Sequence, residues 1–169
     1  MADSEKIAVH DTTAAAIHTE GQAGFISVCK TITSKNINSF IHPERGLWII
    51  SSQGALPEMK NVKNTEGNFP ADFSNVKDGT NKGLPEVDCD AITLWTKEGC
   101  FAQNADLFSD TQIWEYSNLS SEEKNKVLAA TENIQWSAVN TVLNARYYFA
   151  WMDGRWFLVV ADLRQPCQA

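Results

Sequence analysis

The clearest pattern of apolar and polar positions lies near the end of the chain, in YYFAWMDGRWFLVVADL at residues 147–163. Two apolar runs flank an Asp-Gly pair at 153–154, which is the strongest short-range signal for a two-residue β-hairpin turn. A turn at this pair places Tyr147 opposite Val160. The opposite face is also largely apolar, so we predict a central hairpin with helices against one face and more protein, a partner or a ligand against the other. The side chains expected on the Tyr147 face are Tyr147, Phe149, Trp151, Trp156, Leu158, Val160 and Asp162.

Shorter apolar runs predict the remaining strands. Residues 47–50 are apolar throughout and are bounded by glycines, as expected of a buried strand, and residues 56–63 are its expected partner. Further short strands are predicted at 87–95, 99–103, 113–116 and 136–143.

Three segments carry helical signals. From residue 22 onward, apolar side chains recur on one helical face, and a short second helix is expected over 34–41, before Pro43. The segment 119–134 has a stronger start signal, because Ser120 or Ser121 can act as N-cap and Glu123 lies three residues after Ser120. The pattern as a whole is typical of an α+β protein.

The chain length of 169 residues suits one domain with a full core. We expect residues 1–20 to form a loosely ordered N-terminal segment, with one or two helical turns at 11–19, and residues 21–169 to form a single α+β domain. Residues 64–86 are rich in Asn, Gly, Asp and Pro, which predicts a long surface loop.

The net charge of −7 argues against a nucleic-acid partner, since phosphate binding requires a basic surface. No apolar run approaches the roughly 20 residues that a membrane-spanning helix needs, so no transmembrane segment is expected. The start of the chain also lacks the apolar segment of a secretory signal. Cysteine and histidine spacings typical of zinc sites are absent from the sequence, so we expect no metal site and no cofactor.

Four cysteines, at positions 29, 89, 100 and 167, allow three complete pairings. Cys89 and Cys100 bracket a short segment and are the candidate local disulfide in an oxidising compartment. The alternative is four thiols.

A family resemblance rests on two stretches, residues 22–55 with "HPERGLWII" and residues 136–164 with the ending "YFxxxxGxWFLxxxD". Together they resemble the cystatin-like α+β architecture of the NTF2-like superfamily, and the ending is similar to that of NTF2-like domains in exported Bacteroidetes proteins. The resemblance implies N-terminal helices packed on a curved antiparallel sheet that closes with a long C-terminal hairpin. It also implies a conical cavity for binding or catalysis and a periplasmic or secreted location, with the cytoplasm as the alternative.

The candidate catalytic groups inside such a cavity are Asp162, Tyr147 and His42. Asp162 could act as an acid or base near neutrality only if burial raised its pKa. A strand end that has reached the surface is the simpler interpretation of Asp162, and core packing is the simpler interpretation of the aromatic residues. The residues expected to line a site for a small apolar or aromatic-stacking ligand are Trp48, Tyr147, Phe149, Trp151, Trp156 and Asp162.

Three functions are therefore open at this level. The leading hypothesis is a non-enzymatic domain that binds a small molecule or another protein. The first alternative is a small cavity enzyme, hydrolase- or isomerase-like, that uses Asp162 and Tyr147. The second alternative is a homodimer formed through an exposed apolar face of the sheet.

Overall fold

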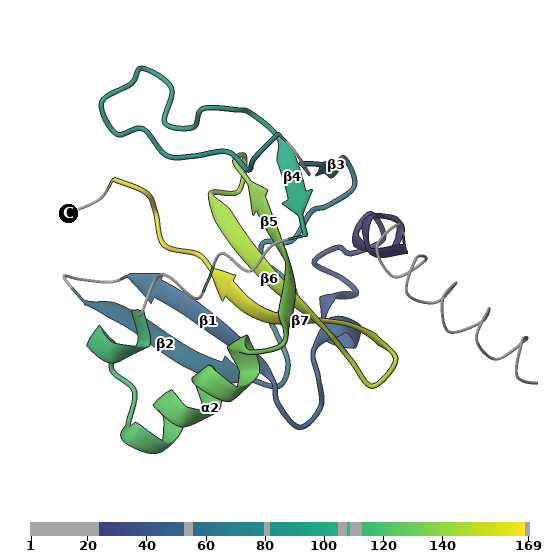
Figure 1. Cartoon of the computed structure of the whole chain (residues 1–169), viewed down its shortest axis with the longest axis vertical. Helices are drawn as coiled ribbons and strands as arrows, with labels where there is room; N and C mark the ends of the chain where they lie inside the picture. The colour runs from purple at the N-terminus through teal and green to yellow at the C-terminus, as the bar shows by residue number, and fades with distance from the viewer. Residues whose placement is uncertain (1–23, 53–55, 80–81, 105–107, 109–112, 168–169) are drawn as a thin grey trace, which may run out of the picture.

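The computed structural model describes residues 24–52, 56–79, 82–104, 108 and 113–167 (Figure 1). The predictions for residues 1–20, including the helical turns at 11–19, lie outside these ranges. Within them, seven strands form one sheet in the order β2-β1-β7-β6-β5-β4-β3. The strands are β1 (Leu47–Ser52), β2 (Pro57–Val62), β3 (Lys77–Asp78), β4 (Cys100–Gln103), β5 (Ile134–Asn140), β6 (Ala145–Met152) and β7 (Arg155–Asp162). The helical elements are residues 24–29, the 3-10 helices η1 (Ile37–Phe40) and η2 (Ile113–Tyr116), and the helix α2 (Ser121–Thr131).

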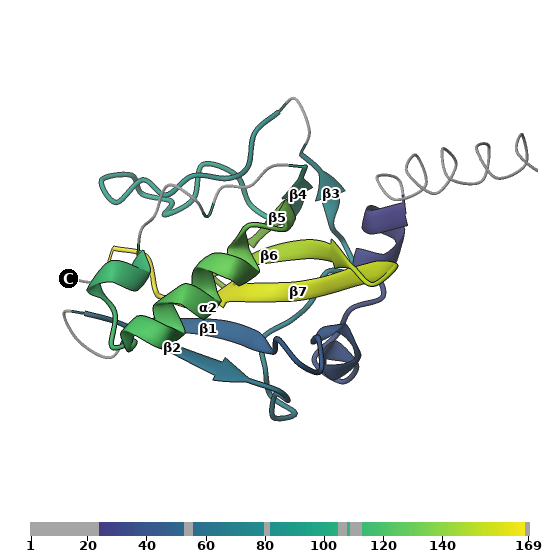
Figure 2. The ribbon, with the colours of Figure 1, turned by 60° about the horizontal axis from the view of Figure 1, so that its bottom comes forward.

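The sheet is mixed, which corrects one part of the predicted fold. β1 runs parallel to β7 and β3 runs parallel to β4, whereas the other neighbouring strands are antiparallel. The α+β class and the closing C-terminal hairpin are confirmed, but the expected curved antiparallel sheet is wrong, because the sheet is mixed and is not strongly curled (Figure 2). The physical reason lies in β7, which is buried at every position after Arg155 and therefore takes a neighbour on each side.

Most predicted strands are confirmed, but two apolar runs adopt other structures. Residues 113–116 form the 3-10 helix η2, because periodicity alone does not separate a short strand from a short helix. Residues 87–95 contain only an isolated bridge between Val87 and Trp95. The helix predicted over 34–41 is reduced to the four residues of η1, which has no side-chain cap.

The hairpin turn lies at Asp153 and Gly154, as predicted. Their φ angles of 52° and 79° are both positive, as a type I′ turn requires, and glycine adopts this conformation without steric cost. The predicted register holds as far as Phe149 opposite Leu158. A bulge at Val159 then shifts the pairing, so Tyr147 lies opposite Ala161 and its predicted pairing with Val160 is wrong by one residue.

Both faces of the sheet are covered by other parts of the chain. The first core packs residues 24–29, η1 and the segment 64–76 onto one face, and the second core packs η2, Phe108 and α2 onto the other (Figure 2). The segment 64–86 is therefore more than a surface loop, because it buries Phe69 and Phe73 and contains β3. Large members of the first core are Phe25, Phe73, Trp136, Tyr147, Phe149 and Leu158, and members of the second are Trp48, Ile50, Met59, Phe108, Tyr148 and Val160.

The disulfide joins Cys89 to Cys167, with a Cα–Cα distance of 5.6 Å. The predicted Cys89–Cys100 bridge is wrong. Cys100 opens β4 and is buried in the first core, as is the other free thiol, Cys29, whereas Cys89 lies in the exposed segment between β3 and β4. Closeness in sequence was misleading here because alternation along β4 turns Cys100 inward.

Candidate functional site

The bulge in β7 separates Tyr147 from Asp162, the two candidate catalytic residues. Tyr147 belongs to the first core and Val160 to the second, so Asp162, two residues beyond Val160, lies on the second face. Asp162 is also aligned with Ile50 of the second core in the parallel β1–β7 pair. Both side chains are buried, but on opposite sides of the sheet.

Tyr147 has a structural partner. Its hydroxyl donates a 2.6 Å hydrogen bond to the carbonyl oxygen of Pro70. Burial, reinforced by nearby acidic groups that include Cys100 and Asp72, raises the pKa of Tyr147 above its ordinary value. The phenol is therefore neutral near pH 7, and its proton is used to satisfy a backbone carbonyl.

Asp162 is compensated by an arginine two residues later. Its carboxylate accepts hydrogen bonds from Nε and Nη2 of Arg164, at 2.9 and 2.7 Å, and from the Arg164 backbone N–H at 3.2 Å. The hydrogen bonds to Asp162 raise the pKa of Arg164. The strand end is buried rather than exposed, and the forked pairing offsets the desolvation of the carboxylate.

His42 is also held on both sides of its ring. Nδ1 accepts hydrogen bonds from the backbone N–H groups of Glu44 and Arg45, each at 3.2 Å. An accepting Nδ1 assigns the ring proton to Nε2, which lies 2.8 Å from Oδ2 of Asp153 at the hairpin tip. His42 thus ties the start of β1 to the β6–β7 turn.

The expected ligand-binding aromatics divide between the two cores. Phe149 and Trp156 each pack edge-on against Phe25 with ring centroids 5.0 Å apart, and Trp151 packs against Trp156 at 5.2 Å. Trp48, by contrast, belongs to the second core and lines an open cleft. Core packing therefore explains Phe149, Trp151 and Trp156, and Trp48 is the predicted residue that leads to a candidate site.

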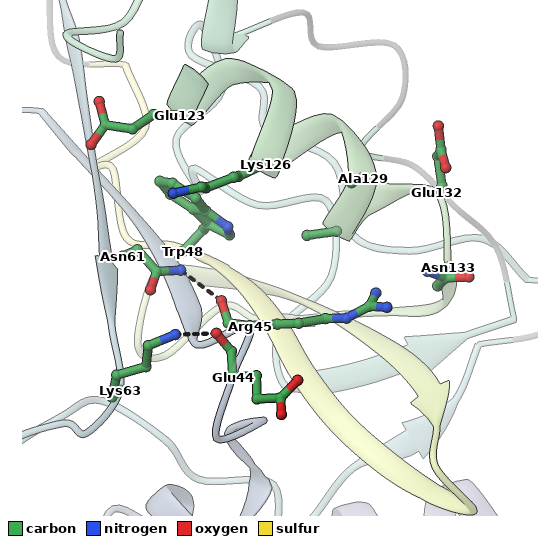
Figure 3. Close-up of a pocket in the computed structure, with 11 residues that line it drawn as sticks. Glu44, Arg45, Trp48, Asn61, Lys63, Glu123, Lys126, Ala129, Glu132 and Asn133 are labelled. Carbon is green, nitrogen blue, oxygen red and sulfur yellow. Dashed lines mark hydrogen bonds between the residues drawn. The ribbon is translucent and has the colours of Figure 1, made fainter. Parts of the chain in front are cut away.

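The cleft lies between α2 and the paired strands β1 and β2 (Figure 3). Its volume of about 720 Å³ falls within the range of roughly 300–1,000 Å³ that is typical of small-molecule sites. The lining residues are Glu44, Arg45, Trp48, Asn61, Lys63, Glu123, Lys126, Ala129, Ala130, Glu132 and Asn133.

Short-range contacts shape the strand side of this cleft. Asn61 is the cross-strand partner of Trp48, and its Nδ2 donates a 2.9 Å hydrogen bond to the Arg45 carbonyl. Lys63 Nζ donates to the neighbouring Glu44 carbonyl. Gly46 joins this turn to β1 with φ +71°, and a Cβ at that position would collide with the Asn61 side chain. The turn is therefore held against β2, with glycine required at its last position.

The helix side supplies small and charged residues. Ala129 and Ala130 line the cleft from α2, and Trp48 lines it from β1. Trp48 is only 3% exposed, so the indole forms the floor of the cleft rather than a freely accessible stacking surface. Glu123 accepts a hydrogen bond from the backbone N–H of Ser120, which lowers its pKa, and Lys126 pairs with Glu122 at 3.2 Å. Glu123 and Lys126 therefore already have partners, at the N-cap of α2 and within α2 respectively.

Arg45 differs from these groups. Its side chain extends across the cleft mouth toward Asn133 (Figure 3), and no carboxylate of the described residues forms an ion pair with it. The arrangement combines an apolar floor with a guanidinium that is available to an acidic group. Arg45 and Trp48 both lie in the sequence segment "ERGLW". No pattern in the sequence predicted that α2 would pack beside them.

Comparison of the whole chain with protein-family models, curated proteins and solved structures gives no match. Among the described residues, no group of three or more His, Cys, Asp or Glu side chains is placed to hold a metal ion. The helices of those same residues also include none long and apolar enough to cross a bilayer. The fold and the cleft therefore define an α+β protein with an open, charged-rimmed groove.

Proposed function

We propose that this protein is a non-enzymatic binding protein whose cleft between α2 and β1–β2 takes a small organic molecule. The proposed ligand has an apolar body that contacts Trp48 at the floor and Ala129 on the helix side, and an acidic group that pairs with Arg45. The observation that carries the proposal is the Arg45 guanidinium at the mouth of a cleft of ligand-binding size, where no carboxylate of the described residues pairs with it. A charged side chain without a protein partner gains more from an incoming anion than one already neutralised.

The positions of the candidate catalytic residues support binding over catalysis. Tyr147 and Asp162 lie on opposite faces of the sheet, and each is committed to a structural partner. Both ring nitrogens of His42 are occupied as well. None of the three lines the cleft, whose ionisable residues are Glu, Lys and Arg.

We further propose an oxidising compartment, periplasmic or extracellular, as the place of action. The Cys89–Cys167 disulfide supports this location, because such bonds persist mainly where thiols are not kept reduced. The NTF2-like resemblance and the homodimer stay predictions. The homodimer was predicted from an exposed apolar face of the sheet. The described residues cover both apolar faces, so this argument for a dimer no longer applies.

The cleft is tested with a library of aromatic carboxylates and their matched amides, screened by ligand-detected NMR against the full chain. Ala129→Trp fills the cleft from an exposed helical position and should abolish binding, whereas Asn125→Trp, at another exposed position of the same helix, should leave it intact. Arg45→Gln should weaken binding of the carboxylates about tenfold, since a charge-assisted hydrogen bond is lost, and should change binding of the amides little. Equal binding to wild type and Ala129→Trp would place the ligand elsewhere and refute the proposal.

A further inference from the structure

A second hollow lies between residues 83–87 and the strands β4, β5 and β6. Residues 82–99, which include this segment, lie at the other end of the sheet from α2 (Figure 1). The hollow has a volume of about 470 Å³. Residues 83–87 form one wall, and the floor includes Gln103 of β4, Ser137 of β5 and two neighbouring residues of β6, Arg146 and Tyr148. Gln103, Ser137 and Tyr148 form a row of cross-strand neighbours, so this floor belongs to the second face of the sheet.

The wall of this pocket is held at several points. Glu86 and Thr96 exchange hydrogen bonds of 2.9 Å across the segment, and the indole Nε1 of Trp95 donates a 2.8 Å bond to Asn144 Oδ1. Immediately after the wall, Cys89 is bonded to Cys167 beyond the end of β7. The pocket is thus formed by a segment tied to the body of the protein, which favours a preorganised site.

Positive charge gathers around this pocket although the protein as a whole is acidic. The Arg146 guanidinium lies 5.5 Å from the ring centroid of Trp95. Lys77 and Lys97 both lie over the Phe101 ring, at 5.8 and 5.9 Å, and Lys97 Nζ also donates to the carbonyl of Gly83 in the pocket wall. Phe101 and Arg146 are two strands apart in one cross-strand row, about 10 Å, so the three cations share one region.

No carboxylate of the described residues forms an ion pair with Arg146, Lys77 or Lys97. Asp162, the cross-strand partner of Arg146, is engaged by the fork of Arg164 instead. Glu86 lines the pocket from an exposed position but forms no ion pair with Arg146. The local field within the pocket therefore favours an anion, and Glu86 is the one carboxylate among the described lining residues that opposes it.

We propose that this pocket is a second binding site, separate from the Trp48 cleft, for a compact polyanion that carries phosphate or several carboxylates. Arg146 is the principal contact, because it lines the pocket and its planar guanidinium binds oxyanions through paired hydrogen bonds. Lys77 and Lys97 add long-range attraction, and Gln103 adds a neutral donor.

The probes are pyrophosphate and citrate, titrated separately into the full chain by calorimetry at low ionic strength. The expected result is one-to-one binding of at least one probe, and the tighter of the two identifies phosphate or carboxylate as the preferred group. Arg146→Gln should weaken binding tenfold or more, Arg146→Lys should weaken it less, and Glu86→Gln should strengthen it about threefold as an opposing charge is removed.

Lys60→Gln provides the matched control, since it removes the same charge from an exposed position on the edge strand β2. It should bind the probe as the wild type does. The proposal is overturned if neither probe binds the wild type, if Arg146→Gln binds as well as the wild type, or if Lys60→Gln is weakened as much as Arg146→Gln. The thermal midpoint of each variant without probe separates a lost site from a lost fold, and Glu86→Gln keeps the test decisive if Arg146→Gln does not fold.

Discussion

Single buried polar groups in this protein are each satisfied by a specific partner, and the partner determines what the residue can do. Tyr147 reaches the Pro70 carbonyl, 77 positions earlier in the chain, and Asp162 is clamped by Arg164. No buried side-chain nitrogen or oxygen of the described residues lacks a hydrogen-bond partner. The buried acid Asp162 and the buried phenol of Tyr147 therefore have structural roles, because their hydrogen-bond partners offset the cost of burying them.

Replacing Tyr147 by Phe tests this at the scale of one residue. The substitution keeps the ring in the first core but leaves the Pro70 carbonyl without its donor, which should cost about 1–2 kcal/mol of unfolding free energy. Urea denaturation measures the loss. Tyr116→Phe, at a side chain that is 66% exposed, should change stability by less than about 0.5 kcal/mol. Equal effects at the two positions would show that the Tyr147–Pro70 bond contributes nothing.

At the scale of an element, α2 follows its local sequence most closely. Ser120 is the N-cap, its hydroxyl accepts from the Glu123 backbone N–H at 3.3 Å, and the Glu123 carboxylate accepts from the Ser120 backbone N–H at 2.8 Å. This reciprocal capping box was predicted because all its participants lie within four consecutive residues. The β6–β7 turn was predicted for the same reason.

The capping box predicts a dependence of stability on pH. The backbone hydrogen bond from Ser120 lowers the pKa of Glu123, so its stabilising effect is fully present above the ordinary glutamate pKa of about 4.3 and is lost as pH falls through the lower folded-state value. At pH 7 the wild type should therefore be more stable than Glu123→Gln, and this gap should close below about pH 4. Denaturant titrations at pH 7 and pH 3 measure it.

Glu66→Gln is the control for removing one negative charge, since Glu66 lies at an exposed position outside the helices. A gap between wild type and Glu123→Gln that keeps its pH 7 size at pH 3 would contradict the role assigned to the Glu123 carboxylate.

At the scale of the whole molecule, the disulfide and the parallel β1–β7 pair join distant parts of the chain. Cys89 and Cys167 are 78 positions apart and link the β3–β4 segment to the end that follows β7. The β1–β7 pair joins the first strand to the last. The disulfide restricts the unfolded chain because it is a covalent link that closes a long loop. The β1–β7 pair, by contrast, forms only in the folded state and must offset the entropy of closing its loop.

Removal of the disulfide should therefore be costly. The double variant Cys89→Ser/Cys167→Ser should lose about 2–5 kcal/mol of unfolding free energy, with a lower thermal midpoint. Dithiothreitol should lower the midpoint of the wild type toward that of the double variant and leave the double variant itself unchanged. A wild type insensitive to complete reduction, verified by thiol titration, would show that the bridge does not stabilise the fold.

Features whose signals are local follow from the amino-acid sequence alone. Residues 153–154 specified the turn, Ser120 and Glu123 specified the start of α2, and the apolar run at 47–50 specified a buried strand. In each case the residues that interact are neighbours along the chain, so the local structure can be predicted from their spacing.

Contacts between residues far apart in the chain depend on the complete fold. The bulge at Val159 moved Asp162 to the face opposite Tyr147, and the fold rather than sequence proximity chose Cys167 as the partner of Cys89. The Trp48 cleft and the pocket at Arg146 likewise depend on where α2 and the β3–β4 segment settle on the sheet. A one-residue shift in a strand exchanges its two faces, and no local pattern records such a shift or the packing of segments far apart in the chain.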